Sequence, residues 1–236
     1  YCTQLEGAGA EAERREMVFS LTTNVTGFFR EEHHFDALRN HILPDLATRA
    51  RAGGRVRLWS AGCSSGQEPF SLAMVVLEAI PEAHRLDVRI LATDIDPHVL
   101  AIATSALYDA NQVEAIPKCL RERYTLSSDA SGASHPKFRV SDEARRLVSF
   151  RQLNLLSDWP MRGRFDVILC RNVVIYFDRE TQKSLWRRFE ERLQPGGHLL
   201  LGHSERIDTS VHSAFQMAGT TTYQRAISGG PAATRS

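Results

Sequence analysis

The most informative chemistry in the sequence lies in a glycine-containing turn at residues 61–66, Ala-Gly-Cys-Ser-Ser-Gly. Two glycines allow the backbone to turn tightly and to approach a ligand closely. The spacing differs from the G-x-G-x-x-G pattern of dinucleotide-binding sheets, and Gln67 stands where a Walker A loop has lysine after the glycine. The turn, with Gly62 at its start, is therefore a candidate ligand-binding loop that lacks a phosphate-binding signature.

A carboxylate follows this turn, because Glu68 lies two residues beyond Gly66. At the start of a helix it would repel a pyrophosphate that seeks the same backbone N–H groups, whereas it would attract a cation. S-adenosylmethionine carries a sulfonium and an ammonium but no phosphate, so Glu68 favours this ligand over NAD. The alternative is a carboxylate that only stabilises the positive end of the helix dipole.

Two further aspartates, Asp94 and Asp96, follow the next apolar run and precede Pro97. A carboxylate at the end of such a strand can accept hydrogen bonds from both hydroxyls of a ribose. Aspartate also caps helices, and proline suits the first helical turn. We assign Asp94 to the ribose of an adenosyl group and Asp96 to the cap, with Asp96 as the rival ribose ligand.

The segment 170–178 reads Cys-Arg-Asn-Val-Val-Ile-Tyr-Phe-Asp and follows a predicted strand. Methyltransferases that act on amide nitrogens usually have Asn or Asp followed by Pro-Pro-Tyr at this place, and the carbonyls there align the amine. Those prolines are absent from this segment. Nitrogen is therefore disfavoured as the methyl acceptor.

The histidines and cysteines do not predict a metal site. His33 and His34 are adjacent, so on a helix they point about 100° apart, and we interpret them as solvated side chains. His203 follows a predicted strand, where a structural hydrogen bond is the alternative to a place in the cavity, and we leave it outside the site. The four separated cysteines suggest neither a zinc site nor a disulfide framework and indicate a reducing cytoplasm: Cys2, Cys63, Cys119 and Cys170.

Strands and helices must alternate to position these residues. The resulting prediction is an α/β fold with a mainly parallel, Rossmann-like sheet and helices on both faces. We expect strands at 55–60, 88–93, 147–153, 165–170, 198–202 and 215–225, and helices at 70–80, 99–106 and 179–193, the last stopped by Pro195-Gly196-Gly197. An earlier helical stripe is disturbed late by Pro44 and comprises Phe28, Phe35, Leu38, Ile42 and Leu46.

Residues 108–150 interrupt the alternation with a polar stretch that is too long for a simple connection. We interpret 109–147 as an inserted small β subdomain, with an antiparallel hairpin around Tyr124 and Phe138–Val140. Residues 1–30 are assigned to a truncated N-terminal helical domain and its linker, residues 31–226 to the main domain, and residues 227–236 to a disordered tail.

The composition is that of a folded globular protein, with 42% hydrophobic and 24% charged residues in 236. Lysine and arginine total 29 against 28 acidic residues, a balance that disfavours nucleic acid as the main partner. The longest apolar stretch, residues 72–80, is far shorter than the roughly 18 to 20 residues that span a bilayer. We therefore expect no membrane insertion.

Six ordered motifs between Ser20 and Arg225 together resemble the catalytic portion of the CheR-type chemotaxis receptor methyltransferases: LTTNVTGFFRE, WSAGCSSGQEPFSLAM, LATDID, NLL, FDVILCRNVVIYFD and GHSE. The resemblance implies methyl transfer from S-adenosylmethionine to receptor glutamate side chains, with S-adenosylhomocysteine as the product. It implies cytoplasmic receptor domains as the substrate, and for some members a receptor C-terminal peptide bound at the inserted β subdomain.

The same resemblance implies which residues form the site. Arg30 and Tyr176 are expected nearest the transferred methyl group, with Arg30 orienting the substrate carboxylate and Tyr176 adding a hydrogen bond. A glutamate with an ordinary pKa near ~4.3 is already an anion at neutral pH and needs no general base. Together with Gly62 from the turn, the expected cofactor contacts are Asn24, Thr26, Arg30, Glu68, Asp94, Asn154, Leu155, Asn172 and Val173.

Two other functions stay open from the sequence. One is a non-catalytic S-adenosylmethionine-binding module within a larger signalling protein. The other is a methyltransferase for a small carboxylic acid, which would need a closed pocket rather than an open groove.

Overall fold

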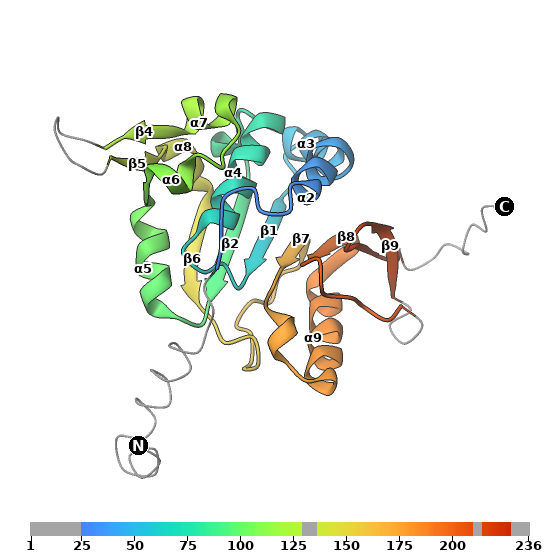
Figure 1. Cartoon of the computed structure of the whole chain (residues 1–236). Helices are drawn as coiled ribbons and strands as arrows, with labels where there is room; N and C mark the ends of the chain where they lie inside the picture. Colours follow the sequence, from blue (N-terminus) through green and yellow to red (C-terminus); the bar gives the residue numbers. More distant parts are fainter. Residues whose placement is uncertain (1–24, 129–135, 210–213, 228–236) are drawn as a thin grey trace, which may run out of the picture.

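The computed structural model describes residues 25–128, 136–209 and 214–227 of the chain. Its centre is a seven-stranded sheet in the order β6-β2-β1-β7-β8-β10-β9 (Figure 1). The pairs from β6 to β8 are parallel, and those from β8 through β10 to β9 are antiparallel. The strands are β1 (Val56–Ala61), β2 (Val88–Asp94), β6 (Val148–Gln152), β7 (Phe165–Cys170), β8 (Leu193–Leu201), β9 (Phe215–Gly219) and β10 (Thr222–Arg225).

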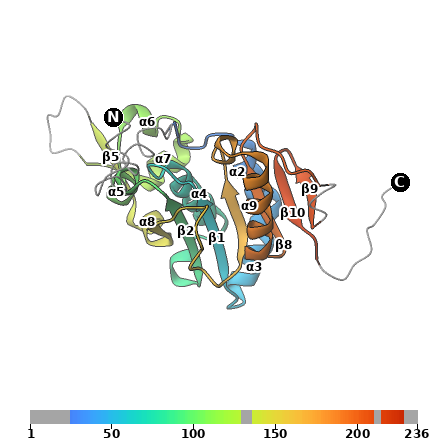
Figure 2. The same ribbon diagram turned by 90° about the horizontal axis from the view of Figure 1, so that it is seen from below.

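Helices cover both faces of this sheet, which confirms the predicted α/β class (Figures 1 and 2). Along β1, Val56 and Leu58 pack in the core cluster with α4, whereas Trp59 and Ala61 pack in the cluster with α9. A strand buried on both faces needs apolar residues at successive positions, as β7 shows, where all six residues are buried and every one except Asp166 is apolar. The covering helices are α2 (His33–Ala37), η2 (Leu38–Ile42), α3 (Leu43–Arg51), α4 (Gln67–Ala79), α5 (Pro97–Ser105) and α9 (Arg179–Arg192), with short 3-10 turns at η3 (Ala83–Arg85) and η4 (Val174–Tyr176).

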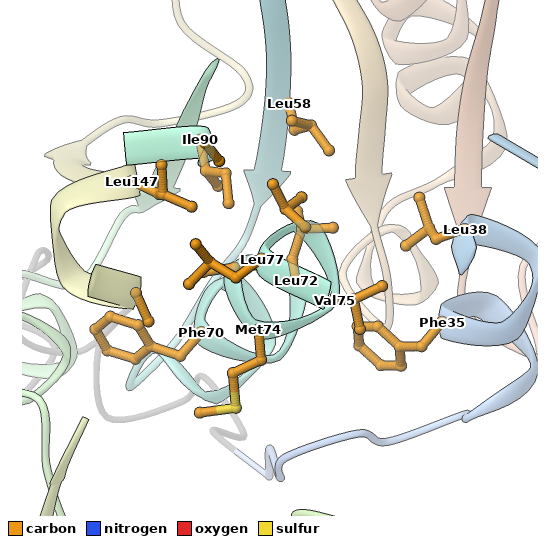
Figure 3. Close-up of a cluster of buried hydrophobic side chains, with 14 of the residues drawn as sticks. Phe35, Leu38, Leu58, Phe70, Leu72, Met74, Val75, Leu77, Ile90 and Leu147 are labelled. Carbon is orange, nitrogen blue, oxygen red and sulfur yellow. The ribbon is translucent and has the colours of Figure 1, made fainter. Parts of the chain in front are cut away.

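Figure 3 shows the larger core cluster, in which side chains of α2, η2 and α4 meet the inner face of the sheet. Phe35 and Leu38 are fully buried there, as the predicted helical stripe requires. The stripe runs through a π-helical turn, η2, immediately before Pro44. Proline has no N–H and its ring crowds the carbonyl four residues earlier, so it accounts for the predicted disturbance.

The segment after α5 forms a second, three-stranded antiparallel sheet in the order β3-β5-β4. The predicted hairpin pairing is confirmed between β4 and β5, where Thr125 lies opposite Val140. A third strand and three short helices were not predicted, because elements of three to seven residues show too little periodicity. These elements are β3 (Leu107–Asp109), α6 (Ala110–Val113), α7 (Lys118–Tyr124), β4 (Thr125–Ser127), β5 (Lys137–Val140) and α8 (Asp142–Leu147).

The carboxyl-terminal part of the sheet corrects two predictions. Pro195-Gly196-Gly197 does not stop α9, since the helix ends at Arg192 and β8 has already begun at Leu193. The register jumps there from Phe165↔Leu193 to Val167↔His198, so the Pro-Gly-Gly segment forms an irregularity within the strand. The single strand predicted at 215–225 is a hairpin of β9 and β10, and Thr221 in its turn has a φ of 48°.

Several predictions concern residues outside the described ranges: most of the N-terminal segment 1–30, including Asn24, and most of the tail 227–236. Within the described part of the chain, no helix combines the length and apolar character that crossing a bilayer requires.

Candidate functional site

A cavity of about 560 Å³ opens at the carboxyl ends of β1, β2 and β7. The chain leaves β1 toward β2 on one side and places β7 on the other, so β1 and β7 flank the topological switch point where α/β sheets bind ligands. The cavity brings together all the predicted site residues within the described ranges: Thr26, Arg30, Gly62, Glu68, Asp94, Asn154, Leu155, Asn172, Val173 and Tyr176. Asn24 lies outside the described residues.

Arg30 reaches the cavity from a tight turn that precedes α2. Its neighbours Phe29 and Glu31 both have left-handed backbone conformations, with φ values of 52° and 58°. The turn is held by the Phe29 N–H, which donates to Ser71 Oγ on α4 at 3.0 Å. Arg30 Nη1 donates to the carbonyl of Val25 at 2.7 Å, so the remaining guanidinium donors are those that could meet a substrate.

The glycine-containing turn after β1 uses its glycine for a close approach between loops. Gly62 has a φ of 85°, and a Cβ at this position would lie 2.4 Å from Val173 Cγ2. Only a residue without a side chain therefore allows the β1 turn and the loop after β7 to form adjacent walls of the cavity.

Glu68, at the start of α4, is oriented by protein groups on both carboxylate oxygens. Ser60 Oγ donates to Oε1 at 2.7 Å, and Arg171 Nη1 donates to Oε2 at 3.0 Å. Burial raises the pKa of Glu68, and the Arg171 charge opposes that effect. We expected a cation near Glu68, and the structure places the buried Arg171 of the chain itself beside it.

Asp94 is the last residue of β2, and its carboxylate holds the turn that follows β1. Its Oδ2 accepts the Ser64 N–H at 2.7 Å, and its Oδ1 accepts the Asp96 N–H at 3.0 Å. A carboxylate has about four lone-pair positions, so these bonds leave acceptor capacity that suits the hydroxyls of a ribose. Asp96 instead caps α5 by accepting the His98 N–H at 2.8 Å, as predicted. Burial raises the pKa of Asp94.

The loop after β6 contributes an apolar wall with one polar turn. Asn154 Oδ1 accepts the Leu156 N–H at 2.9 Å in an Asx turn. Leu155 is buried beside it, and its carbonyl accepts from Trp159 Nε1 at 3.1 Å. With Leu153 and Ile95 also lining the cavity, this wall suits a flat aromatic group such as adenine.

Tyr176 lies at the cavity mouth, on the 3-10 turn η4, with 61% of the residue exposed. Ile175 and Leu156 are also exposed, at 46% and 53%. Arg30 and Tyr176 therefore line one cavity from segments almost 150 positions apart in the chain, as the predicted catalytic pair requires. The cavity is open at this end rather than closed around a small molecule.

Arg171 is the main site residue that we did not predict. It is 6% exposed, forms ion pairs with Glu68 at 3.0 Å and with Glu31 at 3.3 Å, and donates from Nη2 to the carbonyl of Arg30. It therefore links α4 to the turn that presents Arg30. The signal for it was a charged residue directly after the apolar run Val167–Cys170, since such a charge needs a buried partner.

Our interpretation of His34 as a solvated side chain is wrong, because His34 is fully buried. Its Nε2 is within hydrogen-bond distance of Thr221 Oγ1, at 2.8 Å, whereas its Nδ1 lies 3.5 Å from Glu31 Oε2 without forming a hydrogen bond. Burial and the Arg171 charge lower the pKa of His34 to about 3. Burial opposes ionisation of Glu31, but Arg171 and hydrogen bonds from His203 outweigh it and lower the pKa of Glu31 to about 2.

Potential metal-ligand atoms of Glu31, His33 and His34 lie within 4.8 Å of one another, so a third ligand does exist near the two histidines. The guanidinium of Arg171, 3.3 Å from Glu31, opposes a cation there. His203 makes the structural contact that we considered, with Nδ1 3.2 Å from Glu31 Oε1. This cluster joins the turn before α2 to the loop after β8.

Comparison with known proteins identifies the family. Residues 24–224 match the family model described as "CheR methyltransferase, SAM binding domain", SAM being S-adenosylmethionine. The chain is 48% identical over 229 residues to a "Probable chemotaxis protein methyltransferase" of Rhizobium etli, covering 97% of this chain and 85% of that protein. It is 42% identical to "Chemotaxis protein methyltransferase 2" of Pseudomonas aeruginosa, over 91% of this chain and 74% of that protein. It is 37% identical to the "Chemotaxis protein methyltransferase" of Escherichia coli, over 94% and 74% respectively. The cofactor is accordingly S-adenosylmethionine, and the chain belongs to the CheR methyltransferase family.

Proposed function

We propose that this protein methylates glutamate side-chain carboxylates of methyl-accepting chemotaxis receptors, with S-adenosylmethionine as the methyl donor and S-adenosylhomocysteine as the product. The observation that carries the proposal is the convergence of Arg30 and Tyr176 on the cavity that also contains Glu68 and Asp94. The relatives' names, which describe chemotaxis protein methyltransferases, support the same conclusion.

The residues of the cavity fit the cofactor by their chemistry. The Asp94 carboxylate has acceptor capacity left for the ribose hydroxyls, and Leu155 lies in the apolar wall proposed for the adenine. Asn154, Asn172, Val173, Thr26 and Gly62 are proposed as the remaining contacts. Glu68 faces the region where a positively charged amino-acid portion would lie. Bound S-adenosylmethionine supplies a methyl carbon made electrophilic by the adjacent sulfonium.

The chain's own residues need only to orient the nucleophile, because a glutamate side chain is ionised at neutral pH. We assign Arg30 to the substrate carboxylate, since a guanidinium makes charge-assisted, directional hydrogen bonds. We assign Tyr176 a supporting hydrogen bond from the cavity mouth. The exposure of Tyr176 supports a macromolecular substrate that approaches from outside over a small acid enclosed in a pocket.

We further propose that the substrate is the cytoplasmic domain of a receptor and that the protein acts in the cytoplasm, without nucleic-acid partners or membrane insertion. The three-stranded sheet β3-β5-β4, which begins at Leu107 and so starts two residues before the predicted insertion at 109–147, is the proposed place for a receptor C-terminal peptide, since β3 and β4 are the outer strands of this sheet in the described part of the chain. Residues 31–226 form the proposed methyltransferase domain around it.

The test incubates the protein with methyl-labelled S-adenosylmethionine and a receptor cytoplasmic fragment, then releases methanol from the receptor with mild alkali. Base-labile label on the receptor is the expected result. Absence of transfer, while calorimetry shows S-adenosylmethionine binding, would contradict the enzymatic proposal and favour a binding module.

Three substitutions extend this test. Arg30→Ala is expected to slow methyl transfer by about 100-fold, because the carboxylate is no longer oriented. Arg89→Ala is the matched control, since Arg89 is exposed on β2 and lies outside the cavity. Equal rates in the two variants would remove Arg30 from the proposed role. Tyr176→Phe is expected to slow transfer less than Arg30→Ala does, because it removes one hydrogen bond and no charge.

A further inference from the structure

The carboxylate of Glu205, in the loop after β8, accepts four backbone hydrogen bonds. Its Oε1 accepts the N–H groups of Val173 and Val174, both at 2.9 Å. Its Oε2 accepts the N–H groups of Asn172 at 3.0 Å and Gly202 at 2.7 Å. A carboxylate offers about four lone-pair positions, so these donors use the whole acceptor capacity of Glu205. The residue is 3% exposed, so water cannot easily replace these bonds.

Three of these four donors belong to the loop after β7, which forms one wall of the cofactor cavity. Asn172 and Val173 line the cavity, and the same loop continues into η4, which carries Tyr176. Asn172 has a φ of 58°, a left-handed conformation that costs some free energy although asparagine tolerates it better than most residues with a side chain. A buried anion that holds the N–H groups of residues 172–174 at once compensates for this cost.

Gly202, the fourth donor to Glu205, packs closely against both Asn172 and Glu205. A Cβ there would lie 2.7 Å from the Asn172 backbone nitrogen and 2.9 Å from Glu205 Oε2. The glycine and the glutamate of the Gly-His-Ser-Glu motif therefore act together, since one permits the close approach and the other supplies the acceptor.

We propose that Glu205 is a positioning residue for the methyltransferase: its carboxylate fixes the Asn172–Tyr176 loop in the geometry that binds the cofactor. The inference rests on the cofactor-binding role proposed above for Asn172 and Val173, and it adds a residue that lies behind the cavity wall rather than in it. Glu205 contacts neither the cavity nor the reacting atoms.

The test compares Glu205→Gln with Asp166→Asn in the full chain. The glutamine keeps the shape of the side chain but turns an NH₂ group toward two of the N–H donors. Asp166 is a matched control because it is also buried, at 5% exposed, and accepts the Arg57 N–H at 2.8 Å near the opposite end of β7. Calorimetry measures S-adenosylhomocysteine binding at a temperature well below both melting transitions, and thermal unfolding without ligand measures stability.

Both variants are expected to melt at lower temperature than the parent protein. Only Glu205→Gln is expected to weaken S-adenosylhomocysteine binding, by tenfold or more, while Asp166→Asn stays within twofold of the parent. Equal affinities of the two variants would overturn the proposal and leave Glu205 with a purely structural role.

If the glutamine variant does not fold, the same binding measurement is made on Glu205→Asp. The aspartate retains the charge but is one methylene shorter, so we expect a smaller loss of affinity of the same sign. Unchanged affinity in this variant would also overturn the proposal. The outcome is separate from the proposed substrate, because receptor methylation by the parent protein is measured in its own assay and can fail while the binding effect of Glu205 persists.

Discussion

Arg171 and Glu68 form a buried ion pair at 3.0 Å at the base of the cofactor cavity, although they are 103 positions apart in the chain. The same guanidinium also contacts Glu31 at 3.3 Å, so one cation serves two carboxylates. Burying charges is costly unless each is compensated, so removing the shared cation leaves two carboxylates in a poor environment.

Arg171→Met is therefore expected to reduce the free energy of unfolding by about 3 to 5 kcal/mol, because the carboxylates that remain would be buried without a compensating charge. Urea unfolding at neutral pH measures the change. The matched control is Arg145→Met, which removes an ion pair with Asp142 at 2.9 Å on the surface of α8. We expect less than about 1 kcal/mol there, because solvent screens an exposed pair. Similar losses in the two variants would contradict a special role for Arg171.

Asp94 and Asp96 allow cofactor binding to be separated from helix capping. Asp94→Ala is expected to weaken S-adenosylhomocysteine binding by about 1 to 3 kcal/mol through lost hydrogen bonds to a charged group. Asp96→Ala removes the α5 cap and is expected to cost about 0.5 to 2 kcal/mol of stability, with affinity retained. Calorimetry and thermal unfolding of both variants check the two effects. An unchanged affinity in Asp94→Ala would remove that residue from the site.

Gly62 and Gly53 have almost the same backbone conformation, with φ values of 85° and 83°, but different surroundings. Nothing lies within 4 Å of a Cβ built on Gly53, whereas Val173 Cγ2 lies 2.4 Å from one built on Gly62. Gly53→Ala is expected to cost only the left-handed strain, about 1 to 2 kcal/mol. Gly62→Ala is expected to cost more because of the added clash.

Val173→Ala is expected to relieve the clash in Gly62→Ala, because it removes the Cγ2 atom that causes the clash. In the Gly62→Ala/Val173→Ala double variant, we expect part of the stability lost by Gly62→Ala to return. Chemical unfolding of the single and double variants gives the coupling energy. Strict additivity would show that the two loops do not approach as closely as described.

His34 is expected to make the protein less stable in mild acid. Its pKa falls from 6.5 to about 3 on burial, so below pH 6.5 the unfolded chain takes up a proton that the folded protein does not. Stability therefore decreases as the pH falls from 6.5 toward 3, with a limiting slope of about 1.4 kcal/mol per pH unit. Glu31 adds to the loss only below its ordinary value of 4.5, as the pH approaches about 2.

Urea unfolding between pH 7.5 and 5 isolates the contribution of His34. His34→Gln is expected to reduce the slope of stability against pH in this range. His41→Gln is the control, because His41 is exposed on η2 and its substitution should leave the slope unchanged. His198, whose pKa is also lowered by burial, contributes equally to both variants. The same slope in both variants would exclude His34 as the titrating group.

The class of the fold and much of the cavity could be predicted from the sequence alone. Most residues of the apolar runs that become β1, β2 and β7 are buried in a parallel sheet, and such strands are recognisable because their requirement for apolar residues is local. The polar residues that follow these runs, such as Asp94, then necessarily lie at the same edge of the sheet. The positions of Arg30 and Tyr176 in one cavity were expected from the resemblance to a known family and not from any local pattern.

Which charges are buried together depends on tertiary packing and could not be predicted. Arg171 and Glu205 were not among the predicted site residues, yet each is buried and organises segments distant in the chain. His34 was misread for the same reason, since its burial depends on Glu31 beside it and on Thr221 from the β9–β10 turn. Local periodicity reports which face of an element is apolar. Compensation of a buried charge depends on partners that only the packed chain brings within about 3 Å.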